Sequence, residues 1–104
     1  KRKTMSDTHK DITLIQTCES HPEQYDAFFW IDTIGHLVGY LRLRHGCFTV
    51  NFPDVSGEEI YSAYPDGDSA FEDKEREYYL DEARKAIWGK VVESGMLIPE
   101  KTLP

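Results

Sequence analysis

The chain has 104 residues, of which 39% are hydrophobic and 30% charged, and its formal net charge is −7 at pH 7. This length indicates one domain with a single core, and this composition excludes a wholly disordered chain. The acidity argues against a general nucleic-acid binder, which is usually basic, and permits a partner with a basic surface or acidity that serves solubility alone.

The N-terminal residues 1–10 (KRKTMSDTHK) are polar, and we expect a flexible segment there, ahead of a single domain over residues 11–104. Met5 is a candidate native start, which would make residues 1–4 additions to the natural chain. Residues 12–18 (ITLIQTC) are rich in β-branched side chains and predict a strand that pairs with an edge of a sheet. The stretch 19–24 around Pro22 predicts a loop in which His21 is exposed.

Residues 27–52 predict three consecutive antiparallel strands. A two-residue loop, His45-Gly46, separates two strand-like runs, because glycine supplies the positive φ that a tight hairpin needs. This loop places Leu43 opposite Phe48 and keeps apolar side chains on one face. The third strand is expected to end at Pro53.

The first turn of this meander is predicted as a three-residue loop over residues 33–35, with Gly35 in the left-handed conformation. That loop places Phe29 opposite Gly39, where an aromatic ring would cover bare backbone. It also places Asp26 opposite Arg42 as a cross-strand ion pair.

The predicted sheet has two unequal faces. One is apolar and is expected to be buried; its members are Ala27, Phe29, Ile31, Leu37, Leu41, Leu43, Phe48, Val50 and Phe52. The opposite face carries aromatic side chains and arginines; its members are Phe28, Trp30, Val38, Tyr40, Arg42, Arg44, Thr49 and Asn51.

The C-terminal part of the chain predicts a fourth strand of the meander and one long helix. Residues 59–64 (EIYSAY) alternate as a strand does. A capping box from Ser69 to Glu72 predicts the helix start, and Gly95 its C-cap after Ser94. Gly89 within the helix suggests close packing at that point. The helix stripe that should cover the apolar face is Leu80, Ala83, Ile87 and Val91, and the apolar tail 96–99 should fold back on the sheet or contact a partner.

No motif points to catalysis, a metal or a nucleotide, so we predict no catalytic residue, no metal ligand and no cofactor. Asp66, Asp68 and Glu72 lack the spacing of a calcium-binding EF-hand loop. The two cysteines, Cys18 and Cys47, lack metal-binding or redox spacing, which favours reduced thiols and a cytoplasmic location. No apolar run is long enough to span a bilayer.

The sequence therefore predicts an α+β fold: an antiparallel meander of four to five strands with one long C-terminal helix packed on one face. The aromatic face predicts a small acidic non-catalytic binding protein of the inhibitor or regulator type, acting as a homodimer or on another protein. The alternative is a small-molecule (anion) binding or enzymatic domain that uses the same face. Stacking of single-stranded nucleic acid is disfavoured by the net charge. The candidate binding residues are Phe28, Trp30, Tyr40, Arg42, Arg44 and Asn51.

Overall fold

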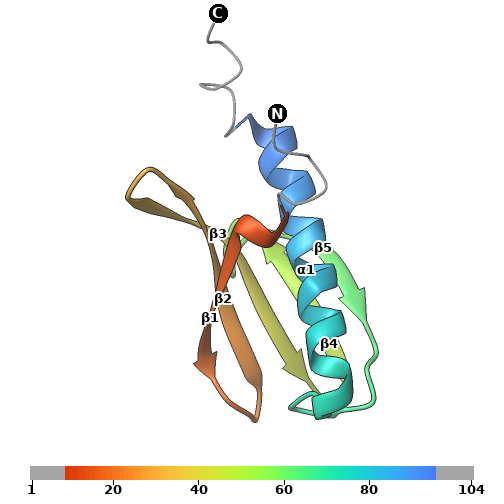
Figure 1. Cartoon of the computed structure of the whole chain (residues 1–104). Helices are drawn as coiled ribbons and strands as arrows, with labels where there is room; N and C mark the ends of the chain where they lie inside the picture. Colours follow the sequence, from red (N-terminus) through yellow and green to blue (C-terminus); the bar gives the residue numbers. More distant parts are fainter. Residues whose placement is uncertain (1–8, 96–104) are drawn as a thin grey trace, which may run out of the picture.

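A computed structural model of the protein describes residues 9–95, which form one five-stranded sheet and one long helix (Figure 1). The predicted positions of residues 1–8 and of the tail 96–99 lie outside the described residues. The elements in chain order are β1 (Ile12–Cys18), β2 (Glu23–Ile31), β3 (Ile34–Arg44), β4 (Cys47–Phe52), β5 (Glu58–Ala63) and α1 (Asp73–Ser94).

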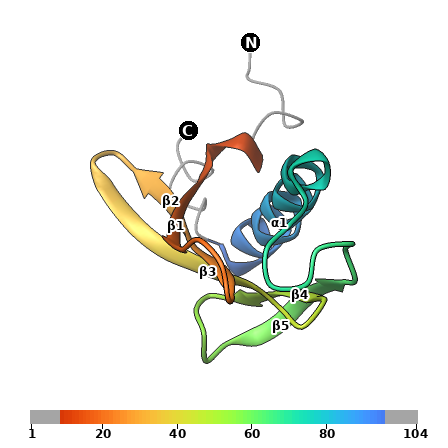
Figure 2. The ribbon, with the colours of Figure 1, turned by 90° about the horizontal axis from the view of Figure 1, so that it is seen from below.

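The sheet is an antiparallel meander in which strands adjacent in the chain are adjacent in space, in the order β1-β2-β3-β4-β5. The sheet curves around α1, which covers one side only (Figure 2). We call the side toward α1 the inner face and the side away from it the outer face. The predicted α+β class and the helix-on-sheet arrangement are confirmed, with β1 pairing at the edge as expected.

The core lies between the inner face and α1. The predicted helix stripe is buried as expected, and Gly95 ends the helix at φ 87°. Aromatic rings fill one end of this layer, where Phe48 packs against Phe71, with ring centroids 5.0 Å apart. The buried apolar residues are Ile12, Tyr25, Ala27, Phe29, Val38, Leu41, Leu43, Phe48, Val50, Phe71, Leu80, Ala83, Ile87 and Val91.

The helix begins one turn later than the sequence predicts. The N-cap is Glu72, whose capping box is completed by Glu75 rather than started by Ser69. Ser69 is held by the sheet instead, because its carbonyl oxygen accepts a hydrogen bond from the N–H of Glu23 at 2.8 Å. A residue tied to the start of β2 in this way cannot also begin the helix.

The five pairs of the β3–β4 ladder all match the prediction, including Leu43 with Phe48 and Arg42 with Thr49; the predicted pair of Gly39 with Phe52 is not part of the ladder. Its loop is the expected His45-Gly46, with φ 52° and 75°. The strand β5 lies one residue earlier than the predicted 59–64. It carries a register shift opposite Val50 and Asn51, where the ladder passes over Ile60.

The predicted register of the β2–β3 hairpin is wrong. The loop has two residues, Asp32 and Thr33, and Ile31 pairs with Ile34. A register shift between Ala27 and Phe28 then admits one extra residue in β3, as a β-bulge does. Val38, predicted on the aromatic face, is therefore in the core. Leu37, predicted in the core, lies opposite Phe28 and is 42% exposed.

Two further expectations are corrected. Ile31 stays on the inner side but is 37% exposed, because the end of the hairpin projects away from the helix (Figure 1). Arg42 pairs with Gln24, so the predicted ion pair between Asp26 and Arg42 does not form.

The side chains that pack against the glycines also differ from the prediction. Trp30, not Phe29, covers a strand glycine: a Cβ on Gly35 would lie 2.8 Å from the Trp30 ring. The close packing expected at Gly89 occurs at Gly39, where a Cβ would lie 2.6 Å from Ile87 Cδ1, while Gly89 has open space.

Candidate functional site

The outer face is the surface that the described residues leave without a covering element (Figure 2). Alternation along each strand selects the side chains that point there. On β2 the buried residues Glu23, Tyr25, Ala27 and Phe29 alternate with less buried neighbours that face outward. The outward side chains include Thr13, Ile15, Phe28, Trp30, Leu37, Tyr40, Arg42, Arg44, Thr49 and Asn51.

One end of the outer face is apolar. Phe28 and Trp30 are neighbours on β2, with ring centroids 6.5 Å apart. Leu37 lies opposite Phe28 on β3. Ile15 lies diagonally across from Phe28 on β1, two residues from Thr13, which pairs with Phe28. We call Ile15, Phe28, Trp30 and Leu37 the apolar patch; Ile15 is 47% exposed and Trp30 is 48% exposed. Large apolar side chains gathered on a surface mark sites of interaction more often than scattered ones do.

The other end of the outer face is cationic. Arg42, Arg44, His45, Cys47 and Thr49 line an open depression of about 290 Å³, which we call the arginine depression. Within residues 9–95, Arg42 and Arg44 form no ion pair. The depression therefore presents two guanidinium groups to solvent without a carboxylate to neutralise them.

The structure divides the predicted site into these two ends. Phe28 and Trp30 lie together in the apolar patch, and Arg42 and Arg44 lie together in the arginine depression. Tyr40 is half-buried between them on β3. Asn51 has a different task, because its side-chain Nδ2 donates to the carbonyl oxygen of Gly57 at 3.0 Å and so holds the β4–β5 turn.

Sequence reasoning missed Ile15 and Leu37 as members of this surface. Ile15 carried no signal, because a single β-branched residue on an edge strand is ordinary. Leu37 was assigned to the core because Leu37 and Val38 are adjacent apolar residues, and alternation alone cannot tell which of them faces inward.

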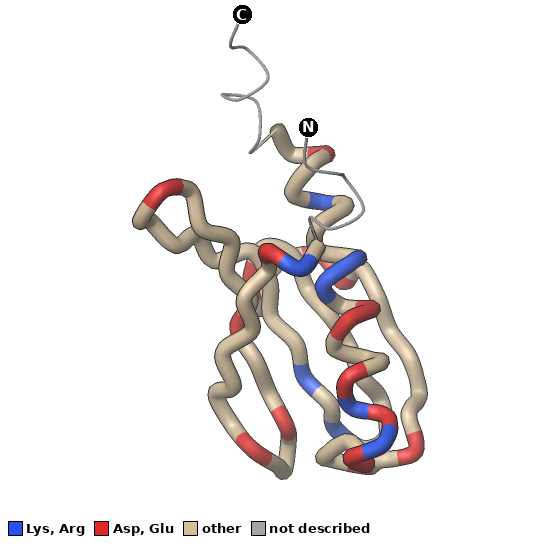
Figure 3. Tube along the Cα trace, viewed as in Figure 1, with Lys and Arg blue, Asp and Glu red and all other residues tan. Residues whose placement is uncertain are grey.

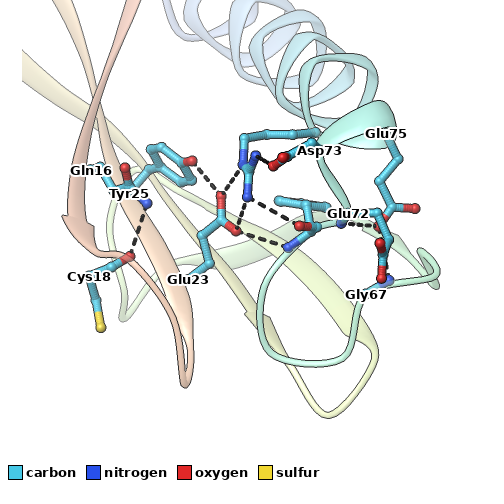
Figure 4. A network of polar contacts seen from close by, with 10 residues as sticks. Gln16, Cys18, Glu23, Tyr25, Gly67, Glu72, Asp73 and Glu75 are labelled. Atoms are coloured by element: carbon cyan, nitrogen blue, oxygen red, sulfur yellow. Dashed lines mark hydrogen bonds and ion pairs between the residues drawn. The ribbon is translucent and has the colours of Figure 1, made fainter.

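A second polar cluster lies inside the molecule and was not predicted. Its centre is Glu23, which is 1% exposed. Its carboxylate accepts hydrogen bonds from Tyr25 Oη at 2.5 Å, from the Phe71 N–H at 2.9 Å and from Arg76 Nε at 2.9 Å. Arg76 also donates to Asp73 at 2.7 Å, so the cluster joins β2 to the start of α1 (Figure 4).

The electrostatics of this cluster are those of a structural contact between β2 and α1. Burial alone would raise the pKa of Glu23, but the hydrogen bonds from Arg76, Tyr25 and the Phe71 N–H outweigh it and hold the pKa below its usual 4.5. Burial and the neighbouring Glu23 carboxylate raise the pKa of Tyr25 far above its usual range. Both Glu23 oxygens already have donors, which leaves no free position for a substrate.

Metal ligands, thiols and membrane-spanning helices are the other features of the described residues to consider. Between residues 9 and 95, no group of three or more His, Cys, Asp or Glu side chains could hold a metal ion. Cys18 and Cys47 are free and half-buried. No helix in the described part of the chain is long and apolar enough to cross a membrane.

Comparison of the chain with family models, with curated proteins and with solved structures finds no match in any of the three. The two ends of the outer face are the features of the structure on which a function can be proposed.

Proposed function

We propose that the protein is a non-catalytic binding protein that acts by protein–protein association through the outer face of its sheet. A second copy of the chain is the partner that we expect at the apolar patch. The observation that carries this proposal is the exposure of Ile15, Trp30 and Leu37 around Phe28 on a face that no described element covers.

The apolar area of the patch favours association. Fully burying a large apolar side chain contributes roughly 1.5–3 kcal/mol, and just under half of the surface of Ile15, Trp30 and Leu37 remains to be buried. Four such residues per copy supply a contact core of the kind found at the centre of protein interfaces, where aromatic residues and arginine are enriched. The polar and charged residues around them would form the rim.

The charge distribution favours self-association through this face over any other. Two copies that each carry a net charge of −7 repel one another wherever acidic surfaces meet. Acidic residues lie mainly on α1, in loops and near strand ends (Figure 3). On the outer face of the five strands the acidic residues are Asp26 on β2 and Glu59 on β5, against Arg42 and Arg44. Contact there brings little like charge together.

The test is the solution mass by light scattering over a range of protein concentrations. We expect a dimer for the wild type and a monomer for Trp30→Glu, which places a charge in the apolar patch. Tyr78→Glu is the matched control, since Tyr78 is an aromatic residue that is 61% exposed and lies on α1, on the side of the sheet opposite the outer face. Circular dichroism checks that both variants remain folded.

A dimer that persists in Trp30→Glu would exclude the apolar patch as its interface. A wild type that stays monomeric at every concentration would overturn self-association. A dimer lost equally in Tyr78→Glu would show that added charge, not the patch, controls assembly.

The second candidate function is binding of a small anion by the same face. It is favoured by the two arginines of the arginine depression, which form no ion pair with any other residue of the range 9–95. This candidate site lies at the opposite end of β3 from the apolar patch.

A further inference from the structure

We propose that the arginine depression is an oxyanion-binding site that takes a carboxylate or phosphate group. The site goes beyond the proposed association, because it lies at the far end of β3 from the apolar patch and needs no second copy of the chain.

The register sets the geometry of the site. Arg42 and Arg44 are alternate residues of β3, so their side chains leave the same face from Cα atoms about 6.5–7 Å apart. Thr49 lies opposite Arg42 and Cys47 lies opposite Arg44 on β4. A guanidinium group presents a planar fork of N–H donors that matches two oxygens of a carboxylate or phosphate. The Thr49 hydroxyl adds a donor beside the fork.

The missing counter-charge is the strongest sign of a ligand. The other two arginines within residues 9–95 are both ion-paired: Arg76 with Glu23 at 2.9 Å, and Arg84 with Glu77 at 3.0 Å. Arg42 instead lies between two uncharged neighbours, Gln24 on β2 and Thr49 on β4. In a chain of net charge −7, two neighbouring arginines on one strand face that have no carboxylate partner among residues 9–95 are unusual.

Neither Asp26 on β2 nor Asp68 is a lining group of the depression. Asp68 lies beside the β3–β4 turn, where its carbonyl oxygen accepts from the Gly46 N–H at 2.7 Å. Its carboxylate accepts from the Ser69 hydroxyl at 3.1 Å and is not a lining group of the depression. Asp68 thus fixes the turn that carries His45, and leaves the arginines free.

The size of the site limits what it can hold. A volume of about 290 Å³ is at the lower limit of pockets that take drug-sized ligands. It suits a small oxyanion, or one carboxylate or phosphate group that projects from a larger molecule. The half-buried Tyr40 borders the site toward the apolar patch.

The direct test is a titration followed by amide NMR shifts, with inorganic phosphate in one series and acetate in the other. Sodium chloride keeps the ionic strength constant, so that screening alone produces no trend. We expect saturable shifts confined to residues 42–49. Saturation by phosphate alone would identify a phosphate site, and saturation by both would identify a general oxyanion site. Shifts that do not saturate in either series would overturn the proposal.

The matched variants separate the site from general charge. The double variant Arg42→Gln with Arg44→Gln should weaken binding at least tenfold. Lys85→Gln, which removes a cation from α1 across the sheet, should leave it unchanged. Equal loss in both variants, or no loss in the double variant, would refute the assignment.

A second measurement uses Cys47 as a reporter in a Cys18→Ser background. The ratio of its alkylation rate by anionic iodoacetate to that by neutral iodoacetamide should be several-fold higher with the arginines present than in the double variant. An unchanged ratio would show that the depression does not concentrate anions. Repeating both measurements on Trp30→Glu keeps the outcome independent of self-association, since the site should survive there even if the dimer does not.

Discussion

The two ends of the β2–β3 hairpin have nearly the same alternation of apolar residues, but apolar side chains are buried at one end and exposed at the other. At one end, Leu41 and Leu43 are fully buried and Glu23 is fastened to α1. At the other end the same two strands project away from the helix, and Ile31 and Ile34 are exposed. The cover over the inner face ends near Phe29, whose ring packs against Trp88 with centroids 5.5 Å apart.

The difference teaches that an alternating strand buries its apolar side only where another element lies over it. α1 supplies that cover along the body of the sheet, and the projecting hairpin has none among the described residues. The uncovered end therefore keeps apolar area available for a partner, while the covered end stabilises the fold.

The largest effect is expected from a charge placed at each end of the same strand. Leu41→Asp puts a carboxylate at a site that is 0% exposed, and we expect the domain to lose its cooperative thermal transition. Ile34→Asp, in the projecting hairpin and outside the apolar patch, changes a residue that is 62% exposed and should stay folded with a change of roughly 0.5 kcal/mol or less. Circular-dichroism melts of both variants check this pair, and a native melt for Leu41→Asp would contradict the core assignment.

The buried Glu23 cluster should contribute more to stability than a surface ion pair does. Glu23→Gln removes the charge that Arg76 and Tyr25 hydrogen-bond, and we expect a loss of about 2–3 kcal/mol in the free energy of unfolding. Glu77→Gln breaks a surface pair with Arg84 and should cost about 0.5 kcal/mol or less. Urea denaturation measures both, and equal effects would show that the buried cluster is no stronger than a surface pair.

The same cluster predicts a pH dependence. Because the pKa of Glu23 is lower in the folded chain than its usual 4.5, its contribution to stability is fully present above about pH 4.5. That contribution is lost as the pH falls through the folded pKa. The stability difference between the wild type and Glu23→Gln should therefore be constant near neutral pH and shrink below about pH 4.5. A difference that grows on acidification would reverse the sign of this linkage.

The parts of the fold that the sequence predicted are those where several local signals agree. The β3–β4 hairpin has a glycine loop and a parity of faces that a one-residue slip would destroy. The helix stripe repeats at the helical period and ends at Gly95. The β2–β3 register failed because the bulge at Val38 follows another apolar residue, so the pattern fits two registers equally well.

The candidate site was predictable as a surface but not as a pair of separate ends. Residue types identified Trp30 and Arg42 as outward and unusual, and the structure places both on the outer face. Their separation along β3 depends on a register that the sequence left open. The Glu23 cluster had no local signal at all, because Arg76 is distant in sequence and both residues resemble surface charges until the fold brings them together.

The smallest effects are expected from alanine substitutions at two glycines, which test how α1 packs on the sheet. Gly39→Ala places a methyl group 2.6 Å from Ile87 Cδ1 and 3.2 Å from Ala27 Cβ, in a core where both neighbours are fully buried. We expect a loss of about 1–3 kcal/mol from overpacking, because Ile87 can move only by disturbing the contact between α1 and β3. Gly89→Ala has open space and improves helix propensity, so it should stabilise the protein by about 0.5–1 kcal/mol. Thermal melts of the two variants should therefore shift in opposite directions, and a Gly39→Ala variant no less stable than the wild type would mean that α1 does not press on β3 at Gly39 as the structure describes.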